Sequence, residues 1–235
     1  AHLTHVVDVG ANPSDGTPPY KNMLSQGLCH VTGFEPQESA LHELIQRKGP
    51  LETYLPQVLG AGGLATLNVC QYSGWTSLLR PSTAALNVFS QFQTNAKVLE
   101  QIQVLTHKLD DISEVRPFDL LKIDVQGAEM DVFHGATQHL KNAVAIQTEI
   151  SFIALYDNQP TFGQVDVYLR TLGFVPHGFV DIKRWPIAPL EFHGSAQQSV
   201  HQLLEADIVY VKDFVHLDGM SDEQLKQLSL IMHHC

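Results

Sequence analysis

Short apolar runs alternate with amphipathic segments along most of the chain, and this alternation limits the fold more than any other feature of the sequence. Residues 5–9 and 120–125 are runs of strand length, and the second is nearly all apolar, as in a strand that is covered on both faces. Leu41, Leu44 and Ile45 lie at helical spacing between such runs. The order of these segments predicts an α/β fold in which helices flank a parallel sheet.

The bounds of the expected elements follow from this periodicity and from the glycine and proline residues around them. The predicted strands are 5–9, 30–36, 52–61, 64–72, 102–112, 120–125, 143–152, 173–185 and 206–213, and the predicted helices are 18–27, 41–48, 126–140, 162–172 and about 221–234. Segments 52–61 and 64–72 are predicted to be a third strand and a hairpin arm, joined through glycine residues. Ser221 and Gln224 have the spacing of a capping box at the start of the last helix.

The composition is that of an ordinary soluble globular protein, with 44% hydrophobic and 17% charged residues. A chain of 235 residues is long enough for one α/β domain, so we expect residues 1–235 to form a single domain. The chain begins without Met and almost inside a strand. This start is compatible with a domain cut from a longer protein that has fused or partner domains.

The charge and the apolar pattern exclude several classes of protein. A formal net charge of −11 argues against nucleic acid as a ligand, because binding a phosphate backbone requires clustered Lys and Arg. The sequence has neither a membrane-spanning apolar run nor the order of a signal peptide, which predicts a cytoplasmic protein without membrane insertion. Cys29, Cys70 and Cys235 are far apart and indicate reduced thiols. The thirteen histidines form no HExxH pattern, and we predict no metal site from them.

The turn after the first strand has the sequence VVDVGAN and points to a ligand at the carboxyl edge of the sheet. Gly10 lets the backbone approach a ligand closely, but Asn12 and Asp15 stand where a dinucleotide fold has its second and third glycines. The motif therefore disfavours NAD. Glu35 ends the second strand and is placed to accept hydrogen bonds from the hydroxyls of a ribose. A nucleoside without a pyrophosphate fits both features, and S-adenosylmethionine is such a ligand.

With these features the chain resembles the FkbM-type methyltransferases, which depend on S-adenosylmethionine. The blocks that carry the resemblance lie within residues 6–212 and are VVDVGAN, GFEP, GWTSLLRP, LDDI, LLKIDVQGAEMDVFHGA, QTEISFIALYDNQPTFGQVDVYLRTLGF and LLEADIVYVKD. The resemblance implies the Rossmann-like class I methyltransferase fold, a seven-stranded, mostly parallel sheet whose last strand is antiparallel. It also implies methyl transfer to a hydroxyl oxygen of a sugar, a glycan or a small secondary metabolite.

The sequence departs from the family in the loop after Asn12. Members commonly carry a glycine two residues after this Asn, where the chain has Ser14, and the Asp15-Gly16 pair is expected to form the turn. Two interpretations stay open. The cofactor is held in an altered way, or the chain is a non-catalytic module that has lost tight cofactor binding. A nicotinamide oxidoreductase is a third hypothesis, which the missing glycines disfavour.

Roles at the cofactor site are carried from the fold of the family onto matching residues. Asp8 and Gly10 are expected at the methionine end, with Asp8 facing the ammonium group, unless Asp8 only fixes the turn. Asn12 either binds the methionine carboxylate or caps the turn. Glu35 is expected to bind the ribose, the alternative being a carboxylate that serves a helix N-terminus. Gly60-Ala61 is expected at the adenine edge, unless it only marks a hairpin turn.

The candidate catalytic residues lie at the ends of two neighbouring strands. Asp124 is expected to face the methyl group of the cofactor and to position the acceptor or remove its proton, and Glu149 flanks the same cleft. Repulsion between the two carboxylates would raise the pKa of one of them. The alternative is that the pair binds a divalent cation. Lys122 is a third candidate, for which a structural salt bridge is the alternative. Glu129 is interpreted as a carboxylate in the first turn of a helix.

The acceptor side is predicted from aromatic residues. Trp75 is a candidate to stack on a sugar ring, or else an aromatic lid over the core. Tyr156, Asp157 and Trp185 are further candidates for contact with the acceptor. The identity of the acceptor does not follow from the sequence, because loops form its pocket.

Overall fold

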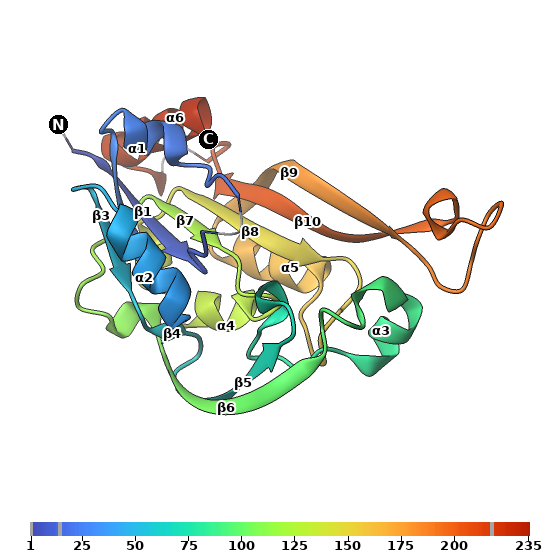
Figure 1. The fold of residues 1–235 in the computed structure, drawn as a ribbon. Coiled ribbons are helices and arrows are strands. Elements are labelled where there is room, and N and C mark those ends of the chain that lie inside the picture. Colours follow the sequence, from blue (N-terminus) through green and yellow to red (C-terminus); the bar gives the residue numbers. More distant parts are fainter. Residues whose placement is uncertain (1, 14–15, 217–218) are drawn as a thin grey trace.

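The computed structural model describes residues 2–13, 16–216 and 219–235, and its centre is a seven-stranded sheet (Figure 1). The strand order is β3-β2-β1-β7-β8-β10-β9. The strands are β1 (Thr4–Val9), β2 (Cys29–Phe34), β3 (Glu52–Leu55), β7 (Leu120–Ile123), β8 (Ala145–Ser151), β9 (Phe174–Pro186) and β10 (His201–Lys212). The pairs from β3 to β8 are parallel, whereas β10 runs antiparallel to both of its neighbours. The predicted fold class is confirmed, including the antiparallel last strand.

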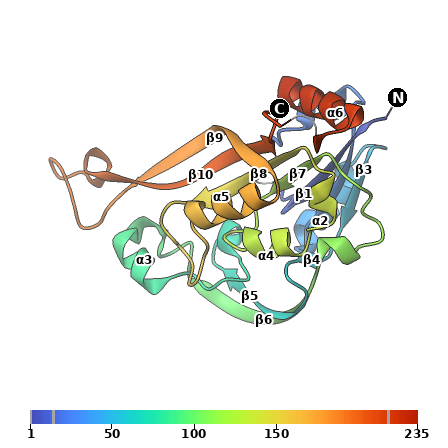
Figure 2. The same ribbon diagram turned by 180° about the vertical axis from the view of Figure 1, so that it is seen from behind.

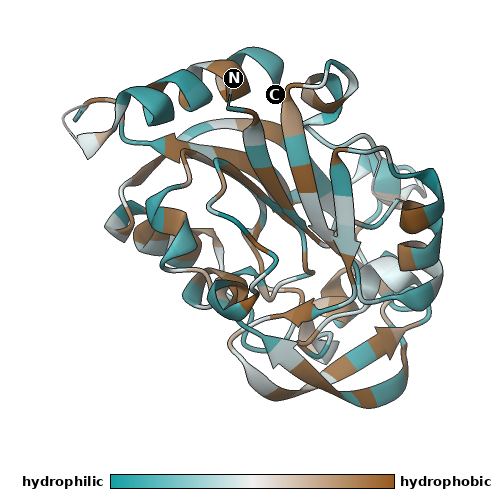
Figure 3. Cartoon of the chain, turned by 90° about the vertical axis from the view of Figure 1, so that its left-hand side faces the viewer, coloured by the Kyte–Doolittle hydropathy of each residue, from teal (hydrophilic) through white to brown (hydrophobic). Residues whose placement is uncertain are grey.

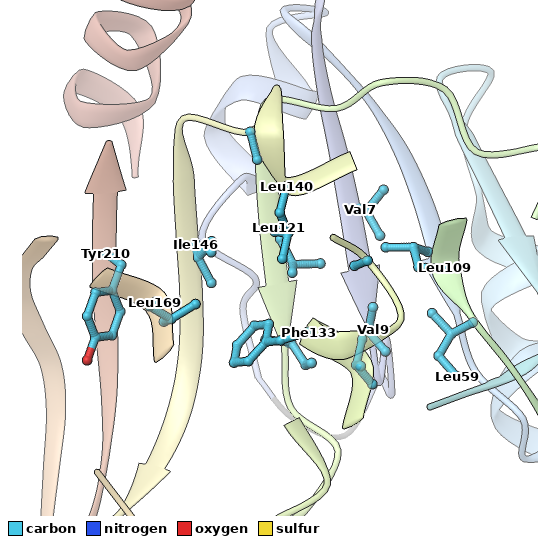
Figure 4. Packing of buried hydrophobic residues seen from close by; sticks show 14 of the residues in the cluster. Val7, Val9, Leu59, Leu109, Leu121, Phe133, Leu140, Ile146, Leu169 and Tyr210 are labelled. Atoms are coloured by element: carbon cyan, nitrogen blue, oxygen red, sulfur yellow. The ribbon is translucent and has the colours of Figure 1, made fainter. Parts of the chain in front are cut away.

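Helices cover both faces of this sheet because alternate side chains of each strand point to opposite sides. The helices are α1 (Lys21–Ser25), α2 (Glu38–Arg47), α3 (Thr83–Val88), α4 (Glu129–His134), α5 (Phe162–Thr171) and α6 (Asp222–His234). One core cluster joins Val7 and Val9 of β1 to Phe133 of α4 and Leu169 of α5 (Figure 4). Figure 2 shows these two helices in front of the sheet. A second cluster joins Val6, on the other face of β1, to residues of α1 and α6. Figure 3 shows apolar residues recurring along the strands between these layers.

A second, three-stranded sheet lies beside the carboxyl ends of β1 and β2. It has the order β4-β6-β5 and consists of β4 (Val58–Leu59), β5 (Gly63–Cys70) and β6 (Val98–His107). The single strand predicted over 52–61 is therefore wrong, because Pro56 has no N–H for the ladder and separates β3 from β4. The predicted hairpin arm exists, but it pairs antiparallel with β6.

Several predicted elements are shorter than expected. The helix predicted over 126–140 begins at Glu129, because Gln126 (φ 57°) and Gly127 (φ 95°) are left-handed, and it ends at His134. The helix predicted over 18–27 is reduced to α1. The extended segment predicted over 102–112 ends at His107 and continues into the 3-10 helix η3 (Leu109–Asp111).

Three further 3-10 turns have no counterpart in the prediction: η1 (Ser73–Trp75), η2 (Ser90–Phe92) and η5 (Ala196–Gln198). A fourth, η4 (His139–Lys141), lies at the end of the helix predicted over 126–140. The capping box at Ser221 is confirmed, since its hydroxyl accepts from the Gln224 N–H at 3.3 Å.

Strands β9 and β10 continue past the sheet as a two-stranded ribbon (Figure 1). The pairing of β10 with β8 stops at Glu205, whereas His201–Leu203 pair only with β9. The ribbon contacts the segment around α3, where the Ala188 N–H donates to the Val88 carbonyl at 2.8 Å. Among the described residues, no helix has the length and apolar character needed to cross a membrane.

Candidate cofactor and acceptor site

A cavity of about 430 Å³ lies between the two sheets, a volume typical of small-ligand sites. On one side it is lined from the carboxyl ends of the main strands by Gly10, Asn12, Glu35 and Asp124. On the other side the second sheet contributes an apolar wall, which consists of Leu59, Leu67, Val69 and Ile102. We call Gly10, Glu35 and Asp124 the strand-end region.

Gly10 brings the ends of β1 and β7 together. Its φ is +78°, and a Cβ at this position would collide with the backbone oxygen of Asp124. The N–H groups of Gly10 and Ala11 both donate to the Phe34 carbonyl at 3.0 Å, which ties the turn to β2. The turn therefore needs glycine because of the Asp124 backbone, whereas the close approach to a ligand that the sequence predicted stays a prediction.

Beneath this turn Asp8 and Lys122 form a buried charge pair. Neither residue lines the cavity. The Lys122 ammonium lies 3.3 Å from Asp8 Oδ1 and donates to the Gly10 carbonyl at 3.0 Å, and the Tyr20 hydroxyl donates to Asp8 Oδ2 at 2.5 Å. Burial raises the pKa of Asp8, and Lys122 opposes this rise. Lys122 thus forms the salt bridge of its alternative interpretation, and it is Lys122 that bonds to the backbone of the turn, whereas Asp8 contacts the side chains of Lys122 and Tyr20.

Glu35 and Asp124 both line the cavity. Glu35 is 2% exposed, and its Oε1 accepts from the Gln37 N–H at 2.7 Å. Asp124 Oδ1 accepts from the side-chain amide of Gln126 at 2.8 Å. Gln126 was not predicted as a site residue, because no spacing rule singles it out.

Glu129 closes the turn that follows Asp124. Its Oε1 accepts from the N–H groups of Val125 and Gly127, at 3.1 Å each. Burial, and then the negative charge of Asp124, raise the pKa of Glu129 to about 7, although the backbone donors oppose this rise. Glu129 thus lies in the first turn of α4, as its sequence position suggested, and it also shapes the loop at the cavity.

Glu149 at the end of β8 lies outside the cavity lining and belongs to a group of charges with Lys183 and Glu205. The Lys183 ammonium lies 3.0 Å from Glu149 Oε1 and 3.1 Å from Glu205 Oε1. Burial raises the pKa of Glu149 well above its ordinary value, and the charges of Asp124 and Glu205 add to the rise. Lys183 and Glu205 were missed because they come from β9 and β10, far along the chain from Glu149.

The aromatic candidates come together in one cluster. The ring of Trp75 lies 5.7 Å from Tyr156 and 5.2 Å from Phe92, and Phe92 lies 4.9 Å from Trp185. None of these four residues lines the cavity. We call them the aromatic region; it matches the alternative of an aromatic lid over the core. Asp157 lies beside it, where its N–H donates to the Arg80 carbonyl at 2.8 Å.

The remaining predicted residues lie at the margins of the site. Gly60 is buried and Ala61 is exposed, and neither lines the cavity, whereas Gln57 to Leu59 just before them do. The predicted departure at Ser14 and Asp15 lies outside the described residues. Within 2–13, 16–216 and 219–235 no group of three or more His, Cys, Asp or Glu residues is arranged to hold a metal ion.

The match to a family model decides the assignment. Residues 8–176 match the model of the methyltransferase FkbM domain. The chain belongs to the FkbM methyltransferase family. The resemblance noted in the sequence is thereby confirmed, and the motifs at Gly10, Glu35 and Asp124 fall within the matched residues.

The chain is also similar, at low sequence identity, to three solved methyltransferases. The magnesium protoporphyrin IX methyltransferase of Synechocystis, solved with bound SAM, is 11% identical with a TM-score of 0.45, over 90% of this chain and 71% of that one. An FkbM methyltransferase of Methylobacillus flagellatus is 12% identical with a TM-score of 0.45, over 89% of this chain and 43% of that one. The precorrin-6y C5,15-methyltransferase of Geobacter metallireducens is 9% identical with a TM-score of 0.43, over 90% and 81%. A search of curated proteins found no match.

Proposed function

We propose that this FkbM-family protein transfers a methyl group from S-adenosylmethionine to a hydroxyl oxygen of a sugar, a glycan or a small metabolite. The observation that carries the proposal is the position of Asp124 in the cavity, with Glu149 on the adjacent strand and its pKa raised well above the ordinary value. A hydroxyl is a poor nucleophile until it loses its proton, and a carboxylate of raised pKa is a suitable base.

In this proposal the strand-end region holds the cofactor. Glu35 accepts hydrogen bonds from the ribose hydroxyls, and the turn at Gly10 faces the methionine end, with Asn12 beside it. The apolar wall of the second sheet covers the adenine ring. Asp8 and Lys122 act from below, by keeping the turn in place.

The sulfonium of the cofactor is already a good leaving group, so the protein has to align the acceptor and accept its proton. Bound S-adenosylmethionine would supply a methyl group on a sulfonium leaving group, and Glu149, on the strand beside Asp124, would take up the proton of the acceptor hydroxyl. Asp124 positions the acceptor beside the methyl group. Lys183, held between Glu149 and Glu205, offsets part of the negative charge of these carboxylates.

The alternative is a methyltransferase-like module that does not catalyse transfer. Lys183 already occupies one oxygen of Glu149, which favours this alternative because a base engaged in a salt bridge accepts a proton less readily.

A transfer assay with methyl-labelled S-adenosylmethionine separates the two functions. The acceptors are a panel of monosaccharides, oligosaccharides and small alcohols, together with matched amines. We expect label on oxygen acceptors, and a rate about 10²–10⁴-fold lower in Glu149→Gln. Glu100→Gln, an exposed change on β6, is the control and leaves the rate unchanged. Cofactor binding without transfer to any acceptor would favour the module, and transfer to amines alone would contradict O-methylation.

A further inference from the structure

Gln126 connects the strand-end region to the aromatic region, and neither the family match nor the sequence motifs give it a role. It lines the cavity directly after Asp124 and Val125. Its side-chain amide donates to Asp124 Oδ1 at 2.8 Å, and its Oε1 lies 3.3 Å from the hydroxyl of Tyr156. The same amide thus contacts the Asp124 carboxylate in the cavity and the Tyr156 hydroxyl in the aromatic region.

The backbone of Gln126 is held in an uncommon conformation. Its φ of 57° lies in the left-handed region, which a glutamine adopts only where the surroundings impose it. The Ser77 hydroxyl donates to the Gln126 carbonyl at 2.7 Å, and Ser77 is itself 2% exposed. The next residue, Gly127, is also left-handed, and its N–H donates to Glu129 Oε1. The turn is therefore fixed on both sides of Gln126, and its side chain has a defined direction.

Tyr156 sets which end of the amide faces Asp124. Its ring is 3% exposed, and burial, followed by the charge of Glu149, raises its pKa well above the ordinary value. The hydroxyl accordingly keeps its proton and shares it between the Trp75 carbonyl at 3.4 Å and Gln126 Oε1. With Oε1 accepting from Tyr156, the amide N–H₂ group is the end that faces the carboxylate.

We propose that Gln126 is a positioning residue that orients the Asp124 carboxylate toward the sulfonium of bound S-adenosylmethionine, with Tyr156 as the anchor of its amide. The proposal rests on the proposed function, since it assumes that cofactor. An amide that donates to one oxygen of Asp124 limits the rotation of the carboxyl group, and the other oxygen is left to face the cavity. The cationic sulfonium gains from this orientation, whereas the neutral sulfur of S-adenosylhomocysteine gains little.

The test compares the two ligands, because they share the adenosine and the amino acid and differ in charge at sulfur. Calorimetric titrations of both ligands are run on wild type, Gln126→Asn and Tyr156→Phe. Asn tolerates the left-handed backbone, but it is one methylene too short to reach both partners. Gln103→Asn is the control, since Gln103 is exposed and its amide donates to the Thr66 hydroxyl at 2.8 Å, outside the cavity lining.

We expect Gln126→Asn to lose about tenfold in its preference for S-adenosylmethionine over S-adenosylhomocysteine, with affinity for the neutral ligand unchanged. Tyr156→Phe loses less, and Gln103→Asn loses nothing. Melting temperatures of the three variants stay within about 2–4 °C of wild type, the range of a change near 1 kcal/mol in a chain of this size. An equal loss of affinity for both ligands would overturn the proposal, because a merely structural role moves both.

A second readout keeps the proposal separate from the proposed function. The side-chain amide resonance of Gln126 is followed by NMR in the ligand-free protein, where the hydrogen bonds to Asp124 and Tyr156 slow its hydrogen exchange. We expect Asp124→Asn and Tyr156→Phe each to shift this resonance. If wild type binds neither ligand, the proposed function fails, while the resonance still decides whether Gln126 is held as described. A resonance unchanged in both variants would overturn the positioning role.

Discussion

The strand-end region lines the cavity and the aromatic region does not, and the two regions are built in different ways. Gly10, Glu35 and Asp124 follow the ends of β1, β2 and β7, and parallel register brings these ends together whatever the loops do. The aromatic region instead joins residues from four separate segments through ring contacts. The first arrangement depends on backbone geometry and the second on side-chain packing, so different substitutions should disturb them.

The largest effect is expected from Gly10→Ala, which tests the backbone geometry of the strand-end region. The new Cβ collides with the Asp124 carbonyl, and alanine at this position has to adopt the unfavourable φ of +78°. We expect a loss of about 3 kcal/mol or more in the free energy of unfolding, measured with urea. Gly27→Ala is the matched control, since Gly27 has φ +67° with open space around it, and it should cost about 1 kcal/mol. Equal losses in the two variants would show that the close approach at Gly10 does not matter.

The pH dependence of stability tests the loop between the two regions. Because the pKa of Glu129 rises from 4.5 to about 7 on folding, the folded protein holds a proton that the unfolded chain releases. The contribution of Glu129 to stability is fully present below pH 4.5 and is lost as the pH rises through 7. The free energy of unfolding should fall by roughly 3 kcal/mol at most over this range. Glu129→Gln should flatten this part of the profile. An unchanged slope in the variant would contradict the assignment.

A change in the aromatic region should affect stability without affecting the cofactor. Phe92 contacts both tryptophans and does not line the cavity. We expect Phe92→Ala to cost about 1–3 kcal/mol in unfolding free energy and to leave S-adenosylmethionine affinity as in wild type. Phe192→Ala is the control. Phe192 lies in the loop between β9 and β10 and is 58% exposed, so its substitution should leave the free energy of unfolding almost unchanged. A loss of cofactor affinity in Phe92→Ala would remove the distinction between the two regions.

The smallest effect is expected at the opposite end of β1. Burial, and then the charges of His2 and His30, lower the pKa of His5 below 6.5. The folded protein therefore binds fewer protons than the unfolded chain, and stability falls as the pH drops below 6.5. Thermal unfolding between pH 7 and pH 5 should show a smaller decline in His5→Gln than in wild type. An identical decline would contradict this role of His5.

The same difference explains how far the sequence was predictive. The main sheet and the positions of Gly10, Glu35 and Asp124 at strand ends were predicted because strand periodicity and strand-end motifs are local in sequence, whereas the roles of these residues stay predictions. The second sheet was not predicted, because β5 pairs with β6, a segment about 30 residues further along the chain, and hydrophobic periodicity does not reveal which strands pair. Lys183, Glu205 and Gln126 were missed for a related reason, since their roles arise from partners on other strands or from a left-handed turn.

The central claim is that the strand-end region binds the nucleoside of S-adenosylmethionine through Glu35. Calorimetric titration of S-adenosylmethionine into wild type and Glu35→Ala tests it most directly, with Glu38→Ala on the exposed start of α2 as the control. We expect micromolar binding to wild type and the control, weakened by about 1–3 kcal/mol in Glu35→Ala, the loss expected for hydrogen bonds to a charged group. Equal affinity in Glu35→Ala, or no binding to wild type, would contradict it.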